Sequence, residues 1–168
     1  MKLAIYPGTF DPITNGHIDL IKRGLGIFDE IIIAVAINPK KSPLFSLEER
    51  LSFIRKTIQH IDAQRISVDS LNGLVVDYAS LKGSVAIIRG LRAVSDFEFE
   101  LQMALMNRRL NNNIETVFMM PSEEYSYLTS TLVKEVVLFG GRVSGLVPDF
   151  VEDALKEKIK GLTKVSSY

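Results

Sequence analysis

The feature that most constrains the fold is a regular alternation of short, β-branched apolar runs with longer segments of helical period. Such alternation is typical of a parallel β-sheet covered by helices. The apolar runs predict strands over Lys2–Tyr6, Ile31–Ile37, Ile66–Val68, Val85–Ile88 and Thr116–Met120. The intervening and following segments predict helices near Gly16–Phe28, Leu47–Ile61, Val75–Lys82, Asp96–Leu110, Ser130–Phe139 and Pro148–Lys160. We therefore expect an α/β fold with a five-stranded parallel sheet and helices on both faces, in a single Rossmann-like domain.

Composition limits the classes of protein to which the chain can belong. With 168 residues, of which 46% are hydrophobic, it suits one domain over 1–168, with 162–168 as a loose tail. Lysine plus arginine and aspartate plus glutamate both number 20, which argues against a nucleic-acid binder. The absence of cysteine excludes disulfides and thiolate metal sites. Without a signal sequence or a run of about 18 apolar residues, we expect a cytoplasmic protein that does not bind membranes.

A loop rich in glycine and proline follows the first predicted strand and leads directly into the first predicted helix. The loop reads PGTFDP over residues 7–12, and the helix begins near TNGH, with His17 in its first turn. Free backbone N–H groups, the positive end of the helix and an imidazole would then meet at one place. This combination predicts a phosphate-binding site.

Cationic and hydroxyl side chains follow most of the other predicted strands. Lys40 and Lys41 follow the second strand, Arg89 and Arg92 follow the fourth, and the hydroxyl-rich segment Tyr125–Thr131 follows the fifth. Because ligands bind outside the carboxyl ends of the strands in an open parallel sheet, these groups should gather at one rim. In a chain without net charge, such a rim indicates a site for a small polyphosphate.

Each of these groups also has a simpler structural explanation. The Gly-His pair can be a turn and a cap, the two lysines can form a solvated loop, and Thr129–Thr131 can be an N-cap. Arg89 follows four apolar residues and needs an anion or a carboxylate beside it, for which Glu98 or Glu100 would serve. A shared site is favoured because all four groups would meet at the same edge of the sheet.

Three segments together resemble the bacterial phosphopantetheine adenylyltransferases, within the nucleotidyltransferases that carry a (T/H)xGH motif. They are YPGTFDPITNGHID over Tyr6–Asp19, IRGLRAVSDFEFE over Ile88–Glu100 and SYLTSTLVKE over Ser126–Glu135. The resemblance covers almost the whole chain. It implies reversible transfer of the adenylyl group of ATP to 4′-phosphopantetheine, giving dephospho-coenzyme A and pyrophosphate in coenzyme A biosynthesis. It also implies Mg²⁺ and a homohexamer, and we expect the ion to arrive on the ATP phosphates because no tight carboxylate cluster appears.

The resemblance assigns roles to the residues at matching positions. Thr9 and His17 would be catalytic and contact the nucleotide phosphates, with His17 stabilising the transition state. The phosphopantetheine site would comprise Thr9, Lys41, Val75 and Arg89. The ATP site would comprise Thr9, Phe10, His17, Gly90, Leu91, Arg92, Glu100, Tyr125, Ser126, Tyr127, Leu128, Thr129, Ser130 and Thr131.

The implied reaction needs no nucleophilic side chain, because an acceptor phosphate can attack the α-phosphorus of ATP directly. Positioning the two anions in line can supply about 7–11 kcal/mol, and one well-placed donor can supply roughly 3–4 kcal/mol. We expect His17 to be neutral in the free enzyme and to donate one N–H, because the positive end of a helix disfavours an imidazolium. Bound phosphate would act in the opposite direction.

Two other functions would use the same cleft. The first is another small nucleotidyltransferase, acting on nicotinate mononucleotide or on an alcohol phosphate. The second is a non-catalytic nucleotide sensor, which would bind ATP without turnover. The IRGLR segment and Lys41 favour phosphopantetheine as the acceptor, and a sensor would have little use for a second anion site.

Overall fold

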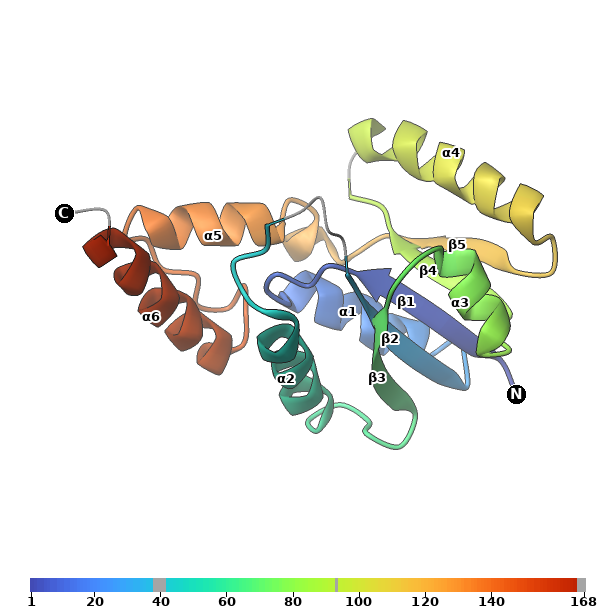
Figure 1. The fold of residues 1–168 in the computed structure, drawn as a ribbon, viewed down its shortest axis with the longest axis horizontal. Helices are drawn as coiled ribbons and strands as arrows, with labels where there is room; N and C mark the ends of the chain where they lie inside the picture. The colour runs from blue at the N-terminus through green and yellow to red at the C-terminus, as the bar shows by residue number, and fades with distance from the viewer. Residues whose placement is uncertain (38–41, 93, 166–168) are drawn as a thin grey trace.

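The computed structural model of the chain describes residues 1–37, 42–92 and 94–165. Its centre is a sheet of five parallel strands in the order β3-β2-β1-β4-β5 (Figure 1). The strands are β1 (Leu3–Gly8), β2 (Glu30–Ala36), β3 (Ile66–Leu71), β4 (Ala86–Gly90) and β5 (Glu115–Met119). The predicted α/β fold with a five-stranded parallel sheet is confirmed.

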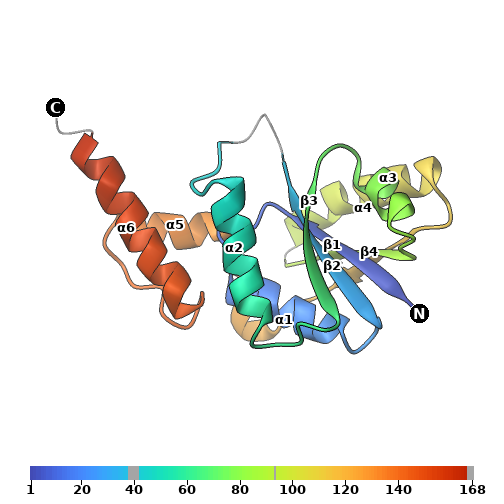
Figure 2. The ribbon, with the colours of Figure 1, turned by 60° about the horizontal axis from the view of Figure 1, so that its bottom comes forward.

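Helices flank both faces of this sheet, as predicted. They are α1 (Asn15–Gly24), α2 (Leu47–Ile58), α3 (Val75–Leu81), α4 (Val94–Leu110), α5 (Ser130–Leu138) and α6 (Asp149–Val165), with a 3-10 helix η1 (Glu123–Tyr125). Helices α1 and α2 lie on one face and α3 and α4 on the other, whereas α5 and α6 extend past the carboxyl end of β1 (Figures 1 and 2). In the described part of the chain, no helix is both long and apolar enough to span a membrane.

The central strand β1 is apolar on both sides because both faces of the sheet are covered there. Successive residues of a strand point to opposite faces. In β1, Ala4 and Tyr6 pack into the larger core cluster with side chains of α1 and α2. Ile5 packs on the opposite face with Val76 and Ala79 of α3. This double burial explains why β1 reads as a continuous apolar run.

Several helix ends differ from those predicted. Helix α1 ends at Gly24 rather than Phe28, because the N–H groups of Gly26 and Ile27 turn back to carbonyls three residues earlier. Helix α2 ends at Ile58 rather than Ile61. Helix α6 continues to Val165, so residues 162–165 are helical and do not belong to the predicted loose tail. Residues 166–168 of that tail lie outside the described residues.

The strand order changes direction beside β1. Strands β2 and β3 lie on one side of β1, and β4 and β5 lie on the other. In an open parallel sheet this reversal leaves a crevice outside the carboxyl ends of the two central strands. The fold therefore provides a ligand site between the loop after β1 and the loop after β4.

Candidate active site

A cleft of about 530 Å³ occupies this position. It is bordered by the loop after β1, the first turn of α1, the end of β4 and the start of α5. Most of the predicted site residues line it, namely Thr9, Phe10, His17, Arg89, Gly90, Arg92, Glu100, Leu128, Thr129, Ser130 and Thr131. The fold thus brings together residues up to 122 positions apart in the chain (9 to 131).

Other predicted site residues lie elsewhere or are not described. Leu91 and Tyr125–Tyr127 do not line this cleft, and Tyr125 instead borders a separate cavity that includes Asn15 and Phe150. Val75 lies in a smaller neighbouring cavity of about 90 Å³, which shares Arg89 and Glu100 with the main cleft. Lys41, with Lys40, falls outside the described residues.

The loop after β1 depends on a close contact between Gly8 and Phe10. Phe10 has a φ of 48°, in the left-handed region that bulky residues rarely adopt. Its ring lies where a side chain at position 8 would be, since a Cβ on Gly8 would stand 2.9 Å from the ring. The buried ring also meets the edges or faces of Tyr6 and His17, at centroid distances of 5.4 and 5.0 Å. Burial of Phe10 therefore offsets its backbone strain and shapes the loop beside His17.

A capping box fixes the tautomer of His17. Thr14 is the N-cap of α1, and its backbone N–H donates to Nδ1 of His17 at 3.0 Å. The Thr14 hydroxyl accepts from the backbone N–H of His17 at 3.4 Å. Since Nδ1 accepts a hydrogen bond, the proton of the neutral imidazole is on Nε2. His17 can thus present one N–H donor to a ligand in the cleft.

The imidazole of His17 is held neutral, as predicted, but mainly for a different reason. Burial lowers the pKa of His17 from 6.5 to about 4, and the nearby positive charge of Arg92 lowers it further. The sequence alone predicts this neutrality from the positive end of α1, whereas the folded structure adds burial and a neighbouring cation. The rings of Tyr6 and Phe10 contribute to the burial.

Arg89 forms the ion pair that the sequence left open, with Glu100 rather than Glu98. Its Nε donates to Oε2 of Glu100 at 2.7 Å and its Nη2 donates to Oε1 at 2.5 Å. The remaining nitrogen, Nη1, lies 3.4 Å from the Pro7 carbonyl. Such a two-point contact orients the guanidinium and leaves the N–H groups of Nη1 outside the ion pair. Arg89 can therefore still meet an anion through Nη1.

The start of α5 closes another side of the cleft. Thr129 caps this helix, with its hydroxyl accepting from the N–H of Leu132 at 2.9 Å, so the simpler structural explanation holds for Thr129. The Ser130 hydroxyl donates to the Pro12 carbonyl at 2.8 Å and ties α5 to the loop after β1. Arg92 donates to the Leu128 carbonyl at 3.2 Å. The hydroxyl-rich segment is thus fixed from two directions.

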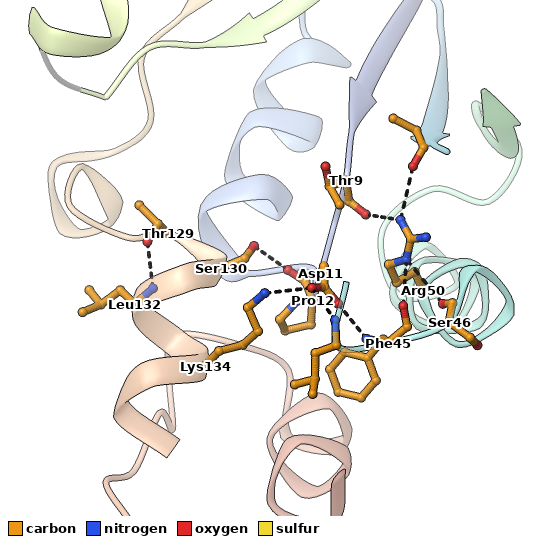
Figure 3. Close-up of polar contacts among 12 residues, drawn as sticks. Thr9, Asp11, Pro12, Phe45, Ser46, Arg50, Thr129, Ser130, Leu132 and Lys134 are labelled. Atoms are coloured by element: carbon orange, nitrogen blue, oxygen red, sulfur yellow. Dashed lines mark hydrogen bonds and ion pairs between the residues drawn. The ribbon is translucent and has the colours of Figure 1, made fainter. Parts of the chain in front are cut away.

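Asp11 and Lys134 are site residues that the sequence analysis missed (Figure 3). Asp11 is buried, and its carboxylate accepts hydrogen bonds from the backbone N–H groups of Leu44 and Phe45, both at 2.9 Å. Lys134 Nζ lies 2.8 Å from the same carboxylate and lines the cleft. The spacing of Lys134 four residues after Ser130, on one face of α5, is the signal that could have revealed it.

The cleft does not resemble a protein metal cage. Its carboxylates, Asp11 and Glu100, are already paired with Lys134 and Arg89. Within residues 1–37, 42–92 and 94–165, no group of three or more acidic or histidine side chains could hold a metal ion. The cations and hydroxyl groups that line the cleft suit an anionic ligand.

We predict that the imidazole of His17 has a pKa of about 4 in the free protein. An NMR pH titration of the histidine rings measures it, with exposed His60 as the internal reference. Between pH 6.5 and 4 the unfolded chain would bind a proton at His17 that the folded chain does not. The contribution of His17 to stability therefore decreases as the pH falls through this range. A pKa above 6.5 would contradict the prediction.

Comparison with known proteins places the chain in a family. Residues 5–136 match the cytidylyltransferase-like family. A phosphopantetheine adenylyltransferase from Thermodesulfovibrio yellowstonii is 59% identical over 160 residues, covering 95% of this chain and 98% of that protein. One from Desulfosudis oleivorans is 55% identical over 159 residues, covering 95% and 94%, respectively. A third, from Clostridium novyi, is 52% identical over 165 residues, covering 98% and 99%.

Solved structures support the fold. A candidate nicotinate-nucleotide adenylyltransferase from Vibrio parahaemolyticus superposes with a TM-score of 0.70 at 17% identity, covering 95% of both chains. At that identity the likeness concerns the fold alone. The sequence matches are much closer and span nearly the full length of each relative. The chain therefore belongs to the phosphopantetheine adenylyltransferase family, within the cytidylyltransferase-like nucleotidyltransferases.

Proposed function

We infer that the protein is an adenylyltransferase that moves the AMP group of ATP to 4′-phosphopantetheine, releasing pyrophosphate and dephospho-coenzyme A. The observation that carries this function is the 51–59% identity to seven relatives with that name, over about 95% of the chain. The cleft at the change of strand order supports it, because it gathers cations, hydroxyl groups and a helix N-terminus.

The proposed chemistry is a direct, in-line displacement. An oxygen of the phosphopantetheine phosphate forms a bond to the α-phosphorus of ATP. The bond from that phosphorus to the bridging oxygen of the β-phosphate breaks, and pyrophosphate leaves with the electron pair. No covalent enzyme intermediate is needed, so the protein has to align the two anions and stabilise the charge on the α-phosphate oxygens.

His17 is proposed to stabilise that charge. Its Nδ1 is occupied by the Thr14 N–H, so Nε2–H is the donor for an α-phosphate oxygen. Arg89, Thr9 and Lys41 are proposed to hold the acceptor phosphate, with Val75 along its path. Glu100 is paired with Arg89 in this structure, which supports a role in orienting that arginine.

ATP is proposed to bind on the side of the cleft formed by β4 and α5. Gly90, Arg92 and Leu128–Thr131 lie on or beside these elements and line the cleft, as do Thr9 and Phe10 of the loop after β1, and Lys134 adds a cation. Mg²⁺ is proposed to enter on the ATP phosphates with water ligands. When bound there, Mg²⁺ would offset part of the negative charge of the ATP phosphates.

We predict that the purified protein releases pyrophosphate from ATP only when 4′-phosphopantetheine is present. A coupled pyrophosphate assay measures this, with nicotinate mononucleotide as the competing acceptor. Release with nicotinate mononucleotide but not phosphopantetheine would identify a different nucleotidyltransferase. Binding of ATP without turnover of either acceptor would instead indicate a nucleotide sensor.

We predict that His17→Ala lowers kcat by about 100- to 1,000-fold, the usual effect of removing one donor to a developing oxyanion. Folding and ATP affinity should be retained, which circular dichroism and calorimetry would show. His60→Ala, at an exposed position beyond α2, is the matched control and should keep full activity. An unchanged kcat in His17→Ala would remove this histidine from the chemistry.

A homohexamer is also proposed, and α4 supplies support that the sequence analysis did not find. Apolar side chains occur around the whole helix, and those that are exposed are Phe97, Phe99, Leu101, Met103, Leu105, Met106 and Leu110. So many large apolar side chains on one exposed helix are unusual for a monomeric protein and mark an interaction surface. A second copy of the chain would cover this surface.

We predict a mass in solution of about six times the 18.8 kDa of one chain, measured by light scattering at micromolar concentration. Met106→Glu should lower that mass because it places a charge on the apolar surface of α4. Ser52→Glu, at an exposed position of α2, is the control. A monomeric wild-type protein would contradict the proposal.

We further propose a cytoplasmic location and no nucleic-acid partner, given the balanced charge.

A further inference from the structure

Arg50 on α2 is a buried cation that the proposed chemistry does not use. Arg50 is only 5% exposed. Within the described residues, the hydrogen bonds of its guanidinium all go to main-chain carbonyls. Burying a charge is costly unless it is well hydrogen-bonded, so these bonds must compensate for the lost hydration. A residue that only filled the core would not need a charge.

The carbonyls come from three places in the chain (Figure 3). Nη1 donates to Thr9, in the loop after β1, at 2.8 Å and to Ala36, the last residue of β2, at 3.3 Å. Nε donates to Phe45 at 3.2 Å and to Ser46 at 3.3 Å, just before α2. Arg50 therefore ties both ends of the connection between β2 and α2 to the loop that carries Thr9.

Helix α2 does not require these bonds in order to begin. Ser46 and Glu49 already form a complete capping box, with Ser46 N–H donating to Glu49 at 2.7 Å and Glu49 N–H donating to Ser46 at 3.2 Å. Two of the carbonyls that Arg50 binds, on Thr9 and Ala36, lie outside the helix altogether. The guanidinium thus serves the relative placement of loops rather than the helix.

Only a planar guanidinium can make this set of contacts. Arginine presents its donors in a rigid fork, so Nε and Nη1 can reach carbonyls on different segments at once. An ammonium group at the same position has the charge but a single nitrogen. Arg50→Lys therefore separates the geometry of the fork from the charge itself.

We propose that Arg50 is a positioning residue for the acceptor side of the cleft. It fixes the Thr9 carbonyl relative to Ala36 at the end of β2 and to Phe45 and Ser46 before α2. This inference rests on the proposed function, in which Thr9 and Lys41 hold the phosphate of phosphopantetheine. The ATP side is formed by β4 and α5, which Arg50 does not contact within the described residues.

The test compares steady-state kinetics of wild-type protein, Arg50→Lys, Arg50→Met and Arg55→Met. Arg55 lies on the exposed side of the same helix and is the matched control. Both Arg50 variants should lose about 100-fold in kcat/KM for phosphopantetheine, the scale of a small misplacement of reacting groups. The KM for phosphopantetheine should rise more than the KM for ATP, because most of the proposed ATP groups lie on β4 and α5, which Arg50 does not contact within the described residues.

Three outcomes would overturn this inference. Folded Arg50 variants with wild-type kinetics would show that the bonds do not position the site. Equal rises in the KM for both substrates would show a general effect on the cleft. Failure of Arg50→Lys to fold would assign Arg50 to global stability. Absence of turnover in the wild-type protein would instead contradict the proposed function, so the two failures are distinguishable.

Discussion

The parallel pairing of β1 with both β2 and β4 is the constraint on which the site depends. Residues Leu3–Gly8 pair with Glu30–Val35 on one side, and Ala4 and Ile5 pair with Ala86 and Ile87 on the other. Because all of these strands run in the same direction, their following loops emerge at one edge. The change of strand order at β1 then separates the loops enough to leave a cleft. The groups of the β1 and β4 loops that line the cleft reach it from this edge.

Within the cleft, charges are arranged in pairs rather than left isolated. Glu100 orients Arg89, and Asp11 orients Lys134. Each carboxylate reduces the net positive charge of the site while it fixes the direction of a cation. A neutral chain can thus present aligned donors to polyphosphates without a broad basic surface, which agrees with its equal numbers of acidic and basic residues.

The sequence predicted the fold and most of the cleft because both depend on short-range patterns. Alternating apolar runs determine the strands, and the TNGH segment places His17 in the first turn of α1. Long-range contacts left no such pattern. Asp11 binds Lys134 across 123 positions, and Arg50 binds the Thr9 carbonyl across 41. Every residue also has a main-chain carbonyl, so the sequence does not show which carbonyls a side chain such as Arg50 will bind.

The surface of α4 was missed for a related reason. Its apolar residues form no single helical stripe, so the sequence does not show which face of the helix packs against the sheet. Only the tertiary structure shows that Phe99, Met106 and Leu110 remain exposed on one chain. Whether a side chain is exposed depends on the residues that the tertiary structure packs against it, whereas helix formation depends largely on the local sequence. In the sequence, apolar residues that contact another copy of the chain look the same as apolar residues of the core.

The neutrality of His17 shows why the surroundings of a donor matter as much as its identity. In the proposed reaction, a charged imidazolium would attract the phosphates of ATP before and during the reaction, and equal attraction in both states gives no acceleration. Burial beside Phe10 and the charge of Arg92 instead favour an uncharged ring whose Nε2–H has a defined direction. In the proposed reaction, Arg92 would supply charge and His17 would supply a directed donor. We infer that this division lets the hydrogen bond strengthen as negative charge grows on the α-phosphate oxygens, where stabilisation lowers the barrier.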